Sequence, residues 1–143
     1  MLELIEKFDI KTILEIGTCY GYTAKLLSEF PGVGRVVSID NRNVIKYPGN
    51  YEFIQVKSED FVPEKFDMVF IDGDHSKTAV TNDYAVALKC NPKLILFHDA
   101  DLSDVAEALK ELNKNFVYLK AENHGKNVES NMGGCELAYE QFN

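Results

Sequence analysis

The stretch "LEIGTCYGYTAK", residues 14–25, passes from a β-rich run into a helix-forming run across two glycines. Its pattern is ExGxxxG, formed by Glu15, Gly17 and Gly21. A dinucleotide-binding turn reads GxGxxG, and the middle glycine that lets the backbone approach a pyrophosphate is missing here. A Walker A loop would continue with lysine after its last glycine, whereas tyrosine follows Gly21. The residues predict a tight turn for a ligand smaller than a dinucleotide, with Glu15 placed to meet a cationic amine; a turn without a ligand is the alternative.

Short runs rich in β-branched and aromatic residues recur on both sides of this turn. They are residues 12–17, 35–40, 51–56, 66–72 and 93–99. Each run is nearly continuous in hydrophobicity, which is typical of strands buried on both faces of a parallel sheet. Helix-forming stretches lie between them, at residues 21–30, 77–89 and 102–113. Strands that alternate with helices predict a doubly wound α/β sheet.

The remaining segments complete the predicted architecture. Two further strands, 115–121 and 135–142, flank a polar loop without a helical pattern, so we expect an antiparallel hairpin at the edge of the sheet. The connections after the second and third strands are too short or too rich in proline and glycine for a full helix. We therefore predict a Rossmann-like, three-layer α/β fold. Its seven-stranded sheet is mostly parallel, with reduced helices after strands two and three.

Composition limits the classes of partner. The length of 143 residues fits one domain, and we expect residues 1–143 to form it. The 15 basic and 23 acidic residues give a net charge of −8 without a Lys/Arg cluster, so no nucleic-acid partner is expected. The three cysteines show no CxxC pairing, which argues against a disulfide framework and a structural zinc site. The sequence shows no signal peptide or spanning apolar run, so we expect a cytoplasmic protein without a membrane partner.

Polar residues gather where the predicted strands end. These residues are Asp40, Ser58-Glu59-Asp60, Asp72-Gly73-Asp74-His75 and His98-Asp99. Ligands of open α/β sheets bind outside the carboxyl ends of the strands, so this edge is the predicted site. The carboxylate of Asp40 can accept hydrogen bonds from both hydroxyls of a ribose. The alternative for Asp40 alone is a helix or turn cap.

Five segments in this order resemble the motifs of class I S-adenosylmethionine-dependent methyltransferases. They are "ILEIGTCYGYTAKLL", "VVSID", "SED", "FDMVFIDGDHS" and "LILFHD". The likeness is greatest to the branch with a FIDGDHS motif after strand four (methyltransferase domain 24-like). It spans residues 12–100, and the two terminal strands fit the terminal hairpin of that family. The resemblance implies S-adenosylmethionine as cofactor and methyl transfer, to an oxygen of a small molecule or sugar, as the activity.

The resemblance also implies a cofactor site. Its residues are Glu15, Gly17, Thr18, Cys19, Tyr20, Gly21, Tyr22, Asp40, Ser58, Glu59, Asp60 and Asp72. Glu15 and the glycine turn would line the methionine end of the cofactor, Asp40 would hold the ribose, and residues 58–60 would lie beside the adenine. For Tyr20 and Tyr22 two roles stay open: covering the cofactor, or packing in the core.

A second group of residues follows strands four and five. Metal-dependent O-methyltransferases that resemble this layout hold a divalent ion there, and Asp72, His98 and Asp99 occupy the corresponding positions. Oxygen ligands suit Mg²⁺, whereas a histidine favours Mn²⁺ or another transition metal. His75 is the first candidate for a general base, because imidazole titrates near neutral pH, or else for a contact with the substrate. Asp74 is grouped with it as catalytic. The alternative is that Asp72 only orients the cofactor and His98 is structural.

The acceptor is the least defined part of the prediction. Many methyltransferases of this class cover the acceptor with N-terminal helices or insertions, and the expected partial lid here is the loop at residues 124–134. A large acceptor could supply its own cover, or a second copy in a homo-oligomer could complete the pocket. A non-catalytic S-adenosylmethionine-binding module or partner subunit is the alternative function. An NAD-dependent enzyme is a weaker alternative, because the middle glycine is missing.

Overall fold

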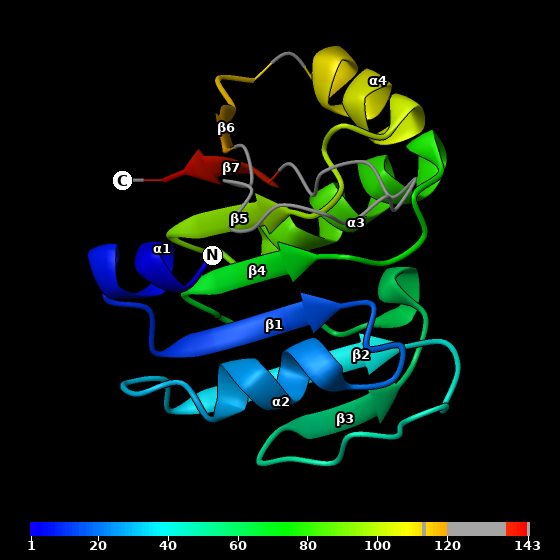
Figure 1. Cartoon of the computed structure of the whole chain (residues 1–143). Coiled ribbons are helices and arrows are strands. Elements are labelled where there is room, and N and C mark those ends of the chain that lie inside the picture. The colour runs from blue at the N-terminus through cyan, green and yellow to red at the C-terminus, as the bar shows by residue number, and fades with distance from the viewer. Residues whose placement is uncertain (113, 120–136, 143) are drawn as a thin grey trace, which may run out of the picture.

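The computed structural model describes residues 1–112, 114–119 and 137–142, and its seven strands form one sheet in the order β3-β2-β1-β4-β5-β7-β6 (Figure 1). The strands are β1 Thr12–Ile16, β2 Arg35–Asp40, β3 Glu52–Gln55, β4 Met68–Ile71, β5 Leu94–Phe97, β6 Val117–Leu119 and β7 Leu137–Gln141. Strands β1 to β5 pair in parallel, and β7 pairs antiparallel with both β5 and β6. The predicted Rossmann-like sheet with its terminal hairpin is therefore confirmed.

Helices cover both faces of the sheet. They are α1 Leu2–Lys7, α2 Tyr22–Ser28, α3 Lys77–Lys89 and α4 Ser103–Leu112, together with one 3₁₀ turn, η1 Ser58–Asp60. Figure 1 shows α2 in front of the sheet and α3 behind it. Buried side chains of α1 and α2 pack on one face, and those of α3 and α4 pack on the other. The three-layer arrangement is confirmed.

The burial of the strands explains their continuous hydrophobicity. Ile13 of β1 packs with α1 and α2, whereas its neighbours Leu14 and Ile16 pack with α3 and α4. Successive side chains of a strand point to opposite faces, so a strand covered on both sides needs apolar residues at every position. All residues of β4 and β5 are buried.

Two connections lack a full helix. The segment between β2 and β3 contains no helix, and η1 is the one helical turn between β3 and β4. The predicted reduction of the helices after strands two and three is confirmed. The segments that follow β2 and β3 at the edge of the sheet are therefore mostly loop residues.

Besides the pairing of β5 with β7, a helix contacts the antiparallel edge of the sheet. The hydroxyl of Tyr84 in α3 donates a hydrogen bond of 2.6 Å to the carboxylate of Glu140 in β7. The expected lid at residues 124–134, together with Cys135, lies outside the described residues. Among the helices in the described part of the chain, none has the length and apolarity needed to cross a bilayer.

Candidate active site

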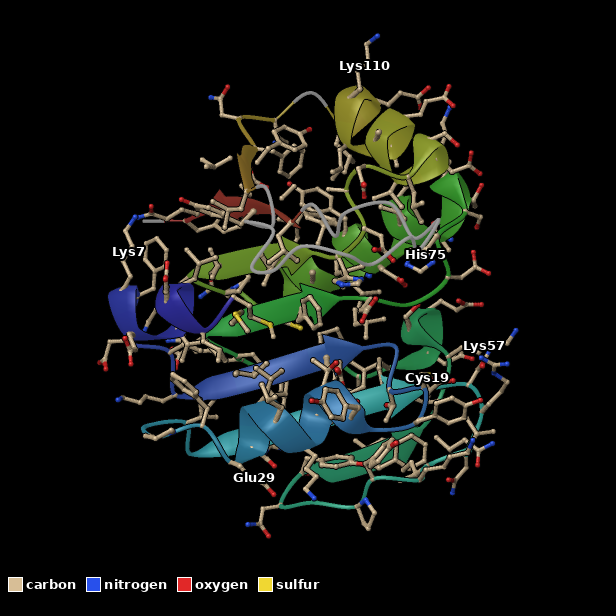
Figure 2. The ribbon with its side chains drawn as sticks, viewed as in Figure 1. Lys7, Cys19, Glu29, Lys57, His75 and Lys110 are labelled. Atoms are coloured by element: carbon tan, nitrogen blue, oxygen red, sulfur yellow. The ribbon has the colours of Figure 1, made fainter. Side chains whose placement is uncertain are left out.

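A pocket of about 900 Å³ opens at the carboxyl ends of β1, β2 and β4. Figure 2 shows Cys19, Lys57 and His75 together at the end of the sheet to which these strands point. A volume of this size suits a cofactor-sized ligand. Eight of the predicted site residues line it: Gly17, Cys19, Asp40, Ser58, Glu59, Asp72, Asp74 and His75.

The glycine turn forms one wall of the pocket and depends on the absence of a side chain. Gly17 has a φ of 104°, and its N–H donates to the carbonyl of Ile39 at 2.8 Å. A Cβ atom at this position would overlap the backbone carbonyl of Asp72. Gly17 therefore lets the turn after β1 pass directly against the end of β4.

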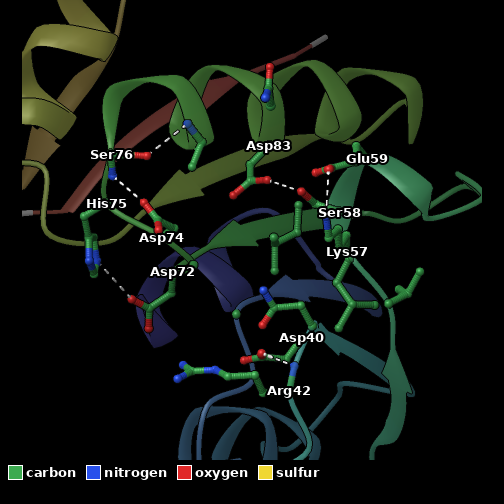
Figure 3. A pocket seen from close by; sticks show the side chains of 18 of the residues that line it. Asp40, Arg42, Lys57, Ser58, Glu59, Asp72, Asp74, His75, Ser76 and Asp83 are labelled. Atoms are coloured by element: carbon green, nitrogen blue, oxygen red, sulfur yellow. Dashed lines mark hydrogen bonds and ion pairs between the residues drawn. The ribbon is translucent and has the colours of Figure 1, made fainter.

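Asp40 lines the pocket and also fixes the turn. One carboxylate oxygen accepts from the backbone N–H of Cys19 at 2.8 Å, and the other accepts from that of Arg42 at 2.9 Å. A carboxylate oxygen has a second lone pair, so both oxygens can still accept from a ligand hydroxyl. In Figure 3, Asp40 faces the cavity from the side opposite Asp83. The turn-capping contacts are thus compatible with the predicted ribose contact.

Glu15 is buried behind the glycine turn and is not among the residues that line the pocket. Its side chain is 1% exposed, and it accepts a hydrogen bond from the hydroxyl of Ser38. Ser38 in turn lies 2.6 Å, hydroxyl to hydroxyl, from Thr18. Burial raises the pKa of Glu15 to about 8. The other carboxylate oxygen, Oε1, is buried and has no hydrogen-bond partner among the described residues, so the contact of Glu15 with the cofactor stays a prediction.

Five further predicted cofactor residues lie outside the pocket lining among the described residues: Thr18, Tyr20, Gly21, Tyr22 and Asp60. Tyr20 and Tyr22 are 45% and 63% exposed, so the alternative that they pack in the core is wrong. The ammonium nitrogen of Lys46 lies over the ring of Tyr20, 3.8 Å from its centroid. Tyr22 packs edge-on against Tyr47. Gly21, with a φ of 82°, precedes the first residue of α2.

The sequence analysis missed Asp83. This carboxyl of α3 is 4% exposed, lines the pocket and accepts a hydrogen bond from the hydroxyl of Ser58. Burial raises its pKa. The available signal is helical spacing, because Asp83 lies three residues after the buried Val80 and four before the buried Ala87. An acid on the apolar face of a helix is a candidate for a polar contact at a site.

A cluster of four ionisable side chains adjoins this pocket. Ile71 and Phe97 are paired as the last residues of β4 and β5, so Asp72 and His98 leave the sheet side by side. One side-chain atom each from Asp72, His75, His98 and Asp99 lies within 4.8 Å of all the others. The structure thus brings together the three predicted metal ligands and the predicted base.

The distances within the cluster are short. Nδ1 of His98 lies 3.0 Å from Oδ1 of Asp72 and 3.1 Å from Oδ2 of Asp99, and Nε2 of His75 lies 3.1 Å from the same Asp99 oxygen. Among the residues that the structure describes, neither nitrogen has a partner that meets the geometry of a hydrogen bond. The Asp72 carboxylate, and then that of Asp99, hold the pKa of His98 above its usual range.

Asp74 stands apart from this cluster. Its carboxylate accepts from the backbone N–H of Ser76 at 2.7 Å (Figure 3). The side chain of Ser76, and then this N–H, hold the pKa of Asp74 below its usual value. Ser76 is the N-cap residue of α3, and its hydroxyl accepts from the N–H of Ala79. The contacts of Asp74 therefore shape the turn that carries His75 into α3.

The backbone after β5 explains how two neighbouring residues reach one cluster. Asp99 has a φ of 50°, in the left-handed region that aspartate tolerates better than most residues. Its carbonyl accepts from the N–H of Leu102 at 2.9 Å, closing a turn before α4. In a continuing strand, His98 and Asp99 would point to opposite faces, whereas this turn brings both side chains to the same centre.

The fold is that of class I S-adenosylmethionine-dependent methyltransferases. The family described as Methyltransferase domain (Methyltransf_24) matches residues 14–100, which is more than half of the chain. The chain belongs to this methyltransferase family. A search among curated proteins gave no match.

Solved structures support the fold. An O-methyltransferase from Bacillus cereus in complex with SAH is 18% identical with a TM-score of 0.67, over 96% of this chain and 77% of that one. A putative caffeoyl-CoA O-methyltransferase from Staphylococcus aureus is 14% identical with a TM-score of 0.70, over 97% and 80%. An rRNA methylase from Streptococcus thermophilus is 12% identical with a TM-score of 0.61, over 99% and 97%. The names of the last two proteins state different acceptors, caffeoyl-CoA and rRNA, so the shared fold does not select an acceptor.

Proposed function

We propose that this chain transfers the methyl group of S-adenosylmethionine to a hydroxyl oxygen of a small molecule or sugar, with the help of a divalent cation. The observation that carries the proposal is the position of Asp72. Its side chain lines the predicted cofactor pocket and also belongs to the four-residue cluster. A methyl donor and the cluster would therefore be neighbours.

The cofactor contacts follow from the pocket. Asp40 accepts from the ribose hydroxyls, and the Ser58–Asp83 pair lies at the side predicted for the adenine. Gly17 leaves space for close contact with the methionine part of the cofactor. The structures of an O-methyltransferase with SAH and of a putative caffeoyl-CoA O-methyltransferase support this fold as a scaffold for O-methylation.

Methyl transfer requires alignment and the removal of one proton. The bond between the methyl carbon and sulfur breaks while the bond from carbon to the acceptor oxygen forms, and holding the reacting atoms about 3 Å apart supplies several kcal/mol of rate acceleration. A divalent cation, when bound, lowers the pKa of a coordinated hydroxyl. Asp72, His98 and Asp99 are the residues that would hold it, because their donor atoms converge and the buried Nδ1 of His98 has no hydrogen-bond partner in the described part of the chain.

The acceptor proton has two routes in this site. The imidazole of His75, whose side chain is 40% exposed, can take it as a general base. Alternatively, water would take it from a hydroxyl whose pKa a bound cation lowers, and His75 would then not be needed as the base. We assign Asp74 a positioning role on either route, because its contact with Ser76 fixes the turn that carries His75.

Calorimetric titration tests the cofactor. The purified chain is titrated with S-adenosylmethionine, S-adenosylhomocysteine and NAD. We expect micromolar binding of both sulfur nucleotides, at least tenfold weaker binding in Asp40→Ala, and no binding of NAD. Asp101→Ala, which removes an exposed carboxylate outside the pocket, is the matched control and should bind as the wild type does. Failure of both sulfur nucleotides to bind would contradict the proposal.

Turnover tests the reaction. Release of S-adenosylhomocysteine is measured with a panel of phenols, catechols and sugars, and corrected for hydrolysis without acceptor. Release that depends on a hydroxyl acceptor and is lost in Asp72→Asn supports O-methylation. Tight cofactor binding without turnover on any acceptor would instead favour the non-catalytic binding module.

A further inference from the structure

The four-residue cluster contains one possible metal ligand, His75, in addition to the three predicted ones. We propose that His75 and His98 both bind the cation, so that this site selects a transition-metal ion such as Mn²⁺, Fe²⁺ or Co²⁺ over Mg²⁺. The inference rests on the proposed function, because it concerns the same cation. It also assigns His75 as a ligand, which leaves the second route for the acceptor proton.

The spacing of the donor atoms fits one shared ion. Adjacent ligands around an octahedral ion with bonds of 2.0–2.2 Å lie about 3 Å apart, and opposite ligands lie about 4.2 Å apart. The two Asp99 contacts, to His75 and His98, are both 3.1 Å, and His75 lies 3.9 Å from Asp72. His98 lies 3.0 Å from Asp72. These four separations of 3.0–3.9 Å lie in the range expected for ligands of one ion.

The two nitrogens behave as ligand atoms rather than as hydrogen-bond donors. Nε2 of His75 and Nδ1 of His98 are both buried, and within residues 1–112, 114–119 and 137–142 neither has a hydrogen-bond partner. The carboxylate oxygens nearest to these nitrogens lie 3.0–3.1 Å away, a distance that also separates neighbouring ligands of one metal ion. A cation between the four groups would satisfy both nitrogens and both carboxylates.

The surrounding structure holds these groups in place. The ring of His98 packs edge-on against Phe70, with centroids 6.1 Å apart. Asp99 keeps a φ of 50°, a backbone conformation that is uncommon outside glycine and asparagine-like residues. Residues held in such conformations gather at functional sites, where neighbouring structure compensates the strain. The carboxylate of Asp99 is thereby set between the two imidazoles.

The donor types decide which ion is preferred. Mg²⁺ favours oxygen ligands and retains much of its water shell, whereas imidazole suits first-row transition metals. Two imidazoles and two carboxylates form a mixed set, in which the nitrogens favour ions from Mn²⁺ to Co²⁺. Four protein ligands also leave positions of an octahedron open for an acceptor hydroxyl and water.

Metal binding can be measured without catalysis. The full chain is stripped with a chelator, and MnCl₂, CoCl₂ and MgCl₂ are titrated separately, with Mn²⁺ followed by electron paramagnetic resonance. We expect Kd values for Mn²⁺ and Co²⁺ at least tenfold below that for Mg²⁺. Pulsed resonance on bound Mn²⁺ should show coupling to two imidazole nitrogens. Equal affinity for Mg²⁺ and Mn²⁺, or absence of nitrogen coupling, would overturn the inference.

The variants separate His75 from the rest of the site. Asparagine retains an oxygen donor but removes the imidazole. His75→Asn should therefore still bind Mg²⁺ but lose the coupling to one nitrogen. The ratio of the Mg²⁺ Kd to the Co²⁺ Kd should fall at least fivefold. Asp101→Asn, two residues from Asp99 and exposed, should leave the preference and coupling unchanged. Unaltered nitrogen coupling in His75→Asn would show that His75 is not a ligand.

A parallel titration with S-adenosylhomocysteine distinguishes failure of the two-histidine metal site from failure of the proposed methyl transfer. Nucleotide binding together with an oxygen-only metal spectrum would overturn the two-histidine site and leave methyl transfer standing. Nitrogen coupling without nucleotide binding would support the metal site and contradict the proposed function. His75 is 40% exposed, so its replacement should not prevent folding, and the circular dichroism spectrum checks this.

Discussion

Gly17 is the residue at which sequence and pocket geometry are most directly linked. Its φ of 104° disfavours any side chain, and a Cβ atom would also overlap the carbonyl of Asp72. Gly32 has a similar φ of 93°, but the nearest atom to a Cβ there would be the ammonium nitrogen of Lys11 at 3.7 Å. Replacing Gly32 therefore tests backbone strain alone, whereas replacing Gly17 tests backbone strain together with steric overlap.

We expect Gly32→Ala to lower the free energy of unfolding by about 1–2 kcal/mol, the usual cost of a left-handed conformation for a residue with a Cβ. Gly17→Ala should lower it by more than that and should also weaken S-adenosylhomocysteine binding at least tenfold. Urea unfolding and calorimetry measure the two effects. Equal stability losses for both variants would show that the close approach to Asp72 is not important.

Glu15 gives a pH-dependent prediction. Burial raises its pKa from 4.5 to about 8 in the folded chain, so between these values the folded state holds a proton that the unfolded state has lost. The folded state therefore becomes less stable as pH rises through this window, by at most about 1.4 kcal/mol per pH unit. In Glu15→Gln, which is neutral at every pH, this decline should disappear.

The measurement is urea unfolding at intervals from pH 5 to pH 8. A Glu29→Gln variant, which changes an exposed carboxylate, should retain the wild-type slope. A Glu15→Gln profile parallel to that of the wild type would show that Glu15 is ionised in the folded protein.

At the scale of elements, a side-chain hydrogen bond from α3 to β7 adds to the pairing of β5 with β7 in holding the antiparallel edge to the parallel strands. Tyr84 is 4% exposed, and its hydroxyl bonds to the Glu140 carboxylate at 2.6 Å. Hydrogen bonds to charged groups contribute about 1.5–3 kcal/mol. We expect Tyr84→Phe to lower the free energy of unfolding by about that amount in urea titrations. Tyr118→Phe, at a 50% exposed position of β6, should change it by less than about 0.5 kcal/mol, and equal effects would contradict the predicted link.

Element boundaries were predictable where the local signals are strong. Helix α3 spans Lys77–Lys89 as predicted, because Ser76 caps its start and Pro92 follows shortly after its end. Helix α2 was predicted from residue 21 to 30 but spans Tyr22–Ser28, since Gly21 takes a left-handed φ that cannot continue a helix. The pattern of hydrophobicity shows that a helix exists, whereas backbone geometry decides where it begins.

At the scale of the whole molecule, charge is the dominant property. The net charge of −8 predicts that the chain does not bind a polyanion, although the fold is shared with an rRNA methylase. A fluorescence anisotropy titration with single-stranded RNA in about 150 mM salt should show no saturable binding below about 10⁻⁴ M. Micromolar binding that weakens as salt is added would instead make nucleic acid a candidate acceptor.

The sequence by itself determined the class of the sheet, the order of its elements and the edge that carries the pocket. Strands buried on both faces must be apolar throughout, and their ends must meet at one edge, so these features are written in local patterns. The tertiary structure decided what the individual side chains do. It buried Glu15 beneath the turn, placed Asp83 in the pocket and set both histidines around Asp99. Such outcomes depend on the direction of each side chain and on neighbours that are distant in sequence, which no local pattern specifies.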